Sequence, residues 1–102
     1  MSEWLRVTLV FPPHLETVIT ESLTADPRMP GYTLLHGEGH TSDFGKASPA
    51  ERVRGRVGRR VLWMLVPAGM KDEVIDLLRT HVDAHDVRWW TEAVLETGRL
   101  GA

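Results

Sequence analysis

The sequence contains no cysteine, which excludes disulfide bonds, thiolate metal sites and cysteine nucleophiles. It also lacks any run of ~18 apolar residues, the length that a membrane-spanning helix needs. Residues 1–3 do not begin the basic and then apolar pattern of a secretory signal. We therefore expect a cytoplasmic protein that does not insert into membranes.

What is present fits one small globular unit. The 102 residues are 42% hydrophobic and 25% charged, which is enough apolar material for one modest core. We expect a single domain over residues 1–102. Small domains without disulfides or metals often gain stability by forming oligomers.

A net charge of −2 conceals a strongly basic segment. Residues 43–60 contain six basic and two acidic residues, whereas the segments on either side are both acidic. The basic residues are Lys46, Arg52, Arg54, Arg56, Arg59 and Arg60. Such asymmetry indicates a place where an anion or an acidic partner is held. The acidic balance of the whole chain argues against a nucleic-acid-binding protein.

The spacing of apolar residues divides the chain into six elements. Strands are predicted over residues 4–11, 32–36, 60–66 and 86–94, and helices over residues 13–25 and 69–82. This order on about 100 residues is typical of the ferredoxin-like fold. We therefore expect an α+β protein with an antiparallel βαββαβ sheet and both helices on one of its faces.

The second and third predicted strands are joined by a long basic loop over residues 40 to about 58, which has no hydrophobic period. Within it, Ser48-Pro49-Ala50-Glu51 has the order of a helix-capping box. We expect a short helical turn over residues 49–54 and a mobile loop around it.

The sheet face away from the helices is predicted to be apolar. Trp4 and Val10 point to that side of the first strand, and residues 61–66 are apolar on both sides of the third. Exposed apolar patches on monomers rarely exceed a few hundred Å². We expect the face to be the interface of a homotrimer, with a dimer as the competing geometry. Of Trp89 and Trp90, which alternate sides, one should join it.

Three local motifs, in this order, resemble the PII-like signalling superfamily. Gly37-Glu38-Gly39 closes the second strand, Arg59-Arg60 ends the long loop, and Thr97-Gly98 follows the last strand. The resemblance implies a trimer with clefts at its subunit boundaries, roofed by the long loop. In PII proteins these clefts hold a nucleotide, and the loop reports the ligand to a partner such as a membrane transporter or regulator.

The sequence departs from typical PII proteins where they wrap phosphates. Residues 80–86 lack the Gly-Asp-Gly-Lys stretch, and Val94 and Glu96 stand where two arginines would precede the Thr-Gly pair. The chain therefore resembles a divergent branch rather than a nitrogen-regulatory PII. We expect weak or no ATP binding.

The leading functional hypothesis is a regulatory or sensing protein that binds a nucleotide or another small anion. Glycine lets an anion approach the backbone, and guanidinium groups offer a bidentate fork. The candidate ligand residues are Gly37, Gly39, His40, Thr41, Arg59, Arg60 and Arg99. Lys46, Arg52, Arg54 and Arg56 are assigned to a partner. Two alternatives involve no ligand. The glycines would only let the chain leave the strand in a tight turn, and the arginines would belong to a solvated charged loop.

The alternative hypothesis is a metal-binding trimer similar to the CutA-like cation-tolerance proteins. Its divalent-metal ligands would come from His36, His40, His81 and His85. Exposed histidines without a ligand role are the plainer explanation. For catalysis we find no nucleophile elbow, no paired carboxylates with a pocket and no Ser-His-Asp order, so we expect a protein that is not an enzyme.

Overall fold

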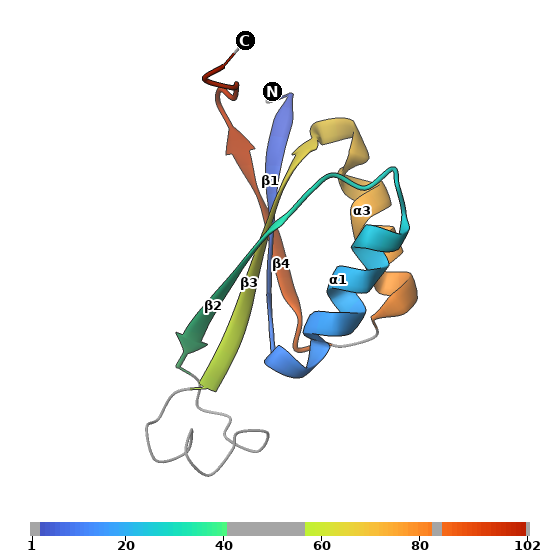
Figure 1. Ribbon diagram of the computed structural model, residues 1–102, viewed down its shortest axis with the longest axis vertical. Helices are drawn as coiled ribbons and strands as arrows, with labels where there is room; N and C mark the ends of the chain where they lie inside the picture. Colours follow the sequence, from blue (N-terminus) through green and yellow to red (C-terminus); the bar gives the residue numbers. More distant parts are fainter. Residues whose placement is uncertain (1–2, 41–56, 83–84, 102) are drawn as a thin grey trace.

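The computed structural model describes residues 3–40, 57–82 and 85–101 (Figure 1). These residues form β1 (Trp4–Phe11), α1 (Glu16–Ala25), β2 (Thr33–Gly39), β3 (Val57–Pro67), α3 (Lys71–His81) and β4 (Arg88–Val94). The strands lie in the order β2-β3-β1-β4, and every neighbouring pair is antiparallel. The ferredoxin-like α+β prediction is thus confirmed.

Both helices begin later than the apolar spacing predicts. The first turn before each is a 3₁₀ helix, η1 (Pro13–Leu15) before α1 and η2 (Ala68–Met70) before α3. Short 3₁₀ turns are common at the ends of α-helices and in the connections that lead into them. The apolar spacing predicts Val18 on the inward stripe of the first helix, but Val18 is 37% exposed, whereas Ile75, which the spacing leaves off the second stripe, is buried.

The β2–β3 hairpin is longer than predicted. Gly37, Glu38 and Gly39 pair with Arg59, Gly58 and Val57, so the strands extend on both sides of the predicted loop. The hydrogen bonds between two strands do not require alternating apolar residues. Residues 37–39 and 57–59 lack such alternation, so the sequence predicts shorter strands. The rest of the predicted loop, with the expected turn over residues 49–54, lies outside the described residues.

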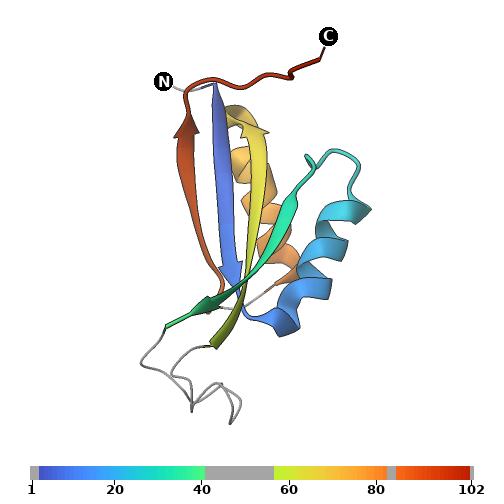
Figure 2. The same ribbon diagram turned by 60° about the vertical axis from the view of Figure 1, so that its left-hand side comes forward.

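The core lies between the sheet and the two helices, which cover the same face in both ribbon views (Figures 1 and 2). Alternate residues of β1 and β3 point into it and meet the apolar stripes of α1 and α3. The buried side chains are Val7, Leu9, Phe11, Ile19, Leu23, Leu62, Met64, Val66, Val74, Ile75 and Leu78. No helix in the described part of the chain is long and apolar enough to span a membrane.

Candidate functional site

The sheet face that no helix covers carries large apolar side chains. This open face includes Trp4, Leu35, Val61, Trp63, Leu65 and Trp90, which share one side through the β1–β3, β1–β4 and β2–β3 registers. Leu65 is 40% exposed and Trp90 is 42% exposed, so neither belongs to the core. A surface of this kind is typical of a protein interface.

A charged cluster lies in the middle of the open face. Arg6 Nε donates a hydrogen bond to Glu92 Oε2 at 2.5 Å across the β1–β4 pair. The Arg6 guanidinium also lies 4.5 Å from the centre of the Trp63 ring. Trp90 Nε1 donates to Glu92 Oε1 at 3.0 Å, and Thr8 Oγ1 donates to Glu92 Oε2 at 3.4 Å. The charges therefore satisfy one another, which makes the face compatible with burial in an assembly.

This charged cluster is absent from the sequence-based predictions. Arg6 and Glu92 are 86 residues apart, and no local pattern joins them. Their hydrogen bond, with that from Trp90, lowers the pKa of the Glu92 carboxyl below its ordinary value of 4.5. The one available signal was a charged residue in the interior of each of two largely apolar strands, with opposite signs: Arg6 in β1 and Glu92 in β4.

The lowered pKa of Glu92 predicts a pH-dependent stability. Because the carboxyl titrates lower in the folded state, its stabilising effect is present above pH 4.5 and is lost as the pH falls through the folded pKa. Glu92→Gln should therefore lower the thermal midpoint at neutral pH, and the difference from wild type should shrink below pH 4.5.

Thermal scans from about pH 7 to about pH 3 measure the effect. Glu21→Gln, on the exposed side of α1, is the matched control and should leave the pH dependence unchanged. Parallel curves for wild type and Glu92→Gln would contradict the assignment.

A shallow depression lies beside the charged cluster. Its volume is about 410 Å³, and it extends from the end of β4 to the segment before β2. Its lining is contributed by Arg6, Gly31, Tyr32, Thr33, Trp63, Leu65 and Val94. A side chain from another subunit packed on the open face would enter it.

Arg59 lies at the far end of the open face, where the β2–β3 hairpin leaves the described residues. It faces Gly37 across the hairpin, and its Cγ would lie 3.1 Å from a Cβ atom built on Gly39. The missing side chain at Gly39 thus makes room for the arginine. Arg59 Nη1 donates to the Gly58 carbonyl at 2.9 Å. Within the described ranges no carboxylate forms an ion pair with it.

Arg60 occupies the opposite side of the sheet, so the predicted Arg59-Arg60 pair is divided. Arg60 Nε donates to Glu16 Oε1 of α1 at 2.7 Å, and His36 Nε2 lies 3.9 Å from the same oxygen. Successive residues of a strand point to opposite faces, which separates the two guanidinium groups. Arg60 therefore ties β3 to α1, with its charge already balanced.

The remaining predicted ligand residues are spread along the molecule. His40 is exposed and directly follows Gly39 at the end of β2. Arg99 belongs to the C-terminal tail, and Figure 1 shows this tail at the opposite end of the molecule from the end of β2. The other predicted residues, Thr41, Lys46, Arg52, Arg54 and Arg56, lie outside the described residues.

The predicted histidine pair for metal is not formed on a helix. α3 ends at His81, and Val82 is its extended C-cap, so His81 and His85 do not share one helical face. Among residues 3–40, 57–82 and 85–101, no three or more His, Asp or Glu side chains group as metal ligands. His36 instead faces Glu16 and Arg60 on the helix side.

Comparison with solved structures defines the class of fold. A DUF3240 family protein from Shewanella baltica aligns with a TM-score of 0.78 at 16% identity, covering 99% of this chain and 100% of that chain. Arabidopsis thaliana PII bound to citrate aligns with a TM-score of 0.73 at 16% identity, covering 97% of this chain and 84% of that chain. The fold is PII-like, in a divergent form, as the sequence motifs predict.

The particular family follows from the sequence itself. The model of the family described as "Protein of unknown function (DUF3240)" matches residues 1–101, and the chain belongs to this family. No curated protein matches the chain.

Proposed function

We propose that this protein is a homotrimeric PII-like sensor that holds a small anion at a subunit boundary, next to Arg59. The observation that carries the proposal is the position of Arg59 on the open face, without an ion pair to any described carboxylate. A half-buried guanidinium of this kind offers a bidentate fork to a carboxylate or phosphate group. The role is binding rather than catalysis.

The open face supports the oligomeric part of the proposal. Its apolar side chains border a charged cluster whose hydrogen bonds are made within one chain, so another subunit can cover the cluster without leaving Arg6 or Glu92 unpaired. Arg59 lies on the same face at its edge. An anion bound there would therefore lie beside the subunit contact rather than deep within one chain.

Fewer residues remain as candidates for binding the anion than the sequence predicts. Gly37 is open to solvent beside Arg59, the space over Gly39 holds the Arg59 side chain, and His40 follows directly. Arg60 is excluded because Glu16 already holds it on the other face. The C-terminal tail, which contains Arg99, lies at the opposite end of the molecule from the end of β2 (Figure 1), so Arg99 can join this site only from another subunit.

The chemistry of the ligand follows from the cationic group and from the plant PII protein of similar fold, which was crystallised with citrate. We assign a small carboxylate or phosphate compound. Ligand binding at the base of the β2–β3 connection would change how its basic residues meet an acidic surface on a partner, such as a transporter or regulator. The metal-tolerance alternative has no comparable support in the described residues.

Isothermal titration with citrate, ATP, ADP, AMP and bicarbonate tests the proposal. We expect Arg59→Ala to weaken binding of the preferred anion by at least about tenfold, because a charge-assisted hydrogen bond is lost. Arg28→Ala removes an exposed arginine from the turn after α1, at the other end of β2 from Arg59, and should leave the affinity unchanged.

Two outcomes would contradict the proposal. One is equal anion affinity in Arg59→Ala and wild type, and the other is tight Zn²⁺ or Cu²⁺ binding without any anion binding. Submicromolar ATP affinity would separately contradict the expectation of weak ATP binding.

A further inference from the structure

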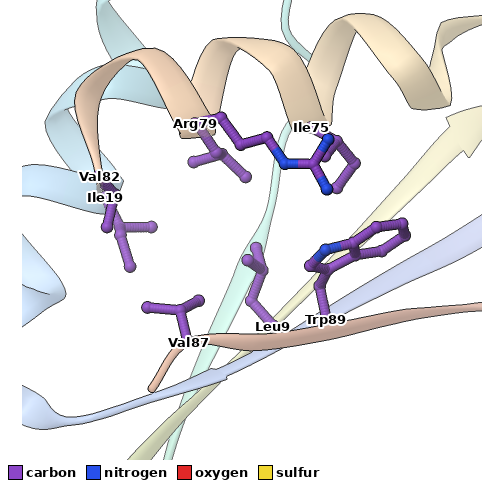
Figure 3. Close-up of a pocket in the computed structure, with 8 residues that line it drawn as sticks. Leu9, Ile19, Ile75, Arg79, Val82, Val87 and Trp89 are labelled. Atoms are coloured by element: carbon purple, nitrogen blue, oxygen red, sulfur yellow. The ribbon is translucent and has the colours of Figure 1, made fainter. Parts of the chain in front are cut away.

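A cavity of about 120 Å³ lies on the helix side of the sheet, between α1, α3 and β4 (Figure 3). It is separate from the open face and from Arg59. Its apolar walls are formed by Leu9, Ile19, Ile75, Leu78, Val82 and Val87. Leu9, Ile19, Ile75 and Leu78 are buried core residues, so the walls are held by the main packing of the protein.

The remaining two lining residues, Arg79 and Trp89, make one side of the cavity polar. Figure 3 shows the Arg79 guanidinium extending from α3 over the indole of Trp89. The guanidinium carbon lies 5.9 Å from the centre of the ring. Trp89 is 39% exposed, which leaves this side open to solvent.

Lys71 and Arg79, the two cations beside the Trp89 ring, differ in their partners among the described residues. Lys71 Nζ also lies 5.9 Å from the Trp89 ring, but it forms an ion pair with Asp72 at 2.5 Å. Within the described ranges, Arg79 has no ion pair with a carboxylate. The indole N–H of Trp89 likewise donates no hydrogen bond to a described residue. Two donors therefore border an apolar cavity.

We propose that this cavity binds a small monocarboxylate with a branched aliphatic or aryl tail. The tail would occupy the apolar walls, and the carboxylate would accept hydrogen bonds from Arg79 and the Trp89 indole. An apolar cavity of ~150 Å³ holds a benzene molecule, so 120 Å³ suits a tail of about six carbon atoms or fewer. A second charge on the ligand would enter the walls without a partner, which excludes dicarboxylates.

The site goes beyond the proposed anion sensor in both place and ligand class. It lies on the opposite side of the sheet from the open face, so oligomer formation through that face leaves it accessible. Its ligand needs an apolar tail, which the Arg59 site does not provide. If the binding test fails at one of the two sites, the proposal for the other site is not affected.

The test is an NMR titration of the full chain with benzoate, 3-methylbutanoate, acetate and benzamide. The indole N–H signal of Trp89, assigned by its loss in Trp89→Phe, should shift with the first two compounds. Both should bind more than about tenfold more tightly than acetate, because their tails leave water. Benzamide has the same ring without the charge and should bind about tenfold more weakly than benzoate.

Variants locate the site and its charge. Arg79→Gln should weaken benzoate about tenfold, whereas Arg88→Gln, on the open side of β4, should not change its affinity. Val87→Phe fills the cavity and should abolish the preference for benzoate over acetate. If Val87→Phe fails to fold, Arg79→Gln still tests the proposed site, because the Arg79 side chain is exposed.

Three results would overturn the proposal. They are no shift of the Trp89 signal with benzoate at millimolar concentration, equal affinity for benzoate and benzamide, and benzoate shifts confined to Gly39 and Arg59.

Discussion

Replacing Leu65 by lysine should dissociate the proposed oligomer at micromolar protein concentration. Leu65 lies on the open face and pairs with Arg6 across the β1–β3 register, and the carboxylate of Glu92 is already bound to Arg6. A lysine there would bring a second positive charge into the contact without a partner. Burying an unpaired charge costs several kcal/mol, so the association constant should fall by more than about 100-fold.

Sedimentation equilibrium measures this effect and also distinguishes a trimer from a dimer in the wild type. The matched control is Val18→Lys, because Val18 on α1 is 37% exposed, almost as much as Leu65, but lies on the helix side. The control should keep the wild-type mass. A monomeric wild type, or a Leu65→Lys variant of unchanged mass, would contradict the assignment of the open face as an interface.

Leu62→Ala should produce the largest loss of folding stability by a single truncation in β3. Leu62 is 0% exposed and packs in the core between the sheet and both helices. Truncation of a fully buried leucine removes its transfer free energy and leaves a cavity, at a cost of about 2–5 kcal/mol. The urea-unfolding midpoint should fall accordingly.

Val18→Ala is the control for this truncation, since it removes apolar carbons from an exposed position on α1. It should change the free energy of unfolding by less than about 1 kcal/mol. Both variants are compared at equal protein concentration, because unfolding of an oligomer depends on it. Equal losses for the two variants would show that the sheet–helix layer does not form the core.

The order of elements and the composition of the core could be predicted from the sequence. The alternation Leu5, Val7, Leu9 and Phe11, together with the helical stripes, determines which faces must be buried whatever the neighbours are. The opposite faces of Trp89 and Trp90 also follow from this period of two. These features are local, because they arise from backbone geometry and the hydrophobic effect along one element.

The ends of the hairpin and the division of the two arginines were decided by strand pairing. Gly37-Glu38-Gly39 has no apolar period, so the sequence prediction placed these residues at a loop entrance. Their hydrogen-bonded ladder with residues 57–59 extends both strands and directs Arg59 and Arg60 to opposite faces. The predicted ligand cluster thereby becomes one candidate arginine on the open face and one structural ion pair with Glu16.

The sequence by itself determined the layer of buried residues, the apolar character of the open face and the absence of cysteine chemistry. Only the tertiary structure decided which distant side chains meet. Arg6 reaches Glu92 because β1 lies between β3 and β4 in one register, and Arg79 meets Trp89 because α3 packs over the β4 edge. Such contacts depend on strand order, register and helix placement, which are properties of the whole chain and are not set by the local pattern of any one element.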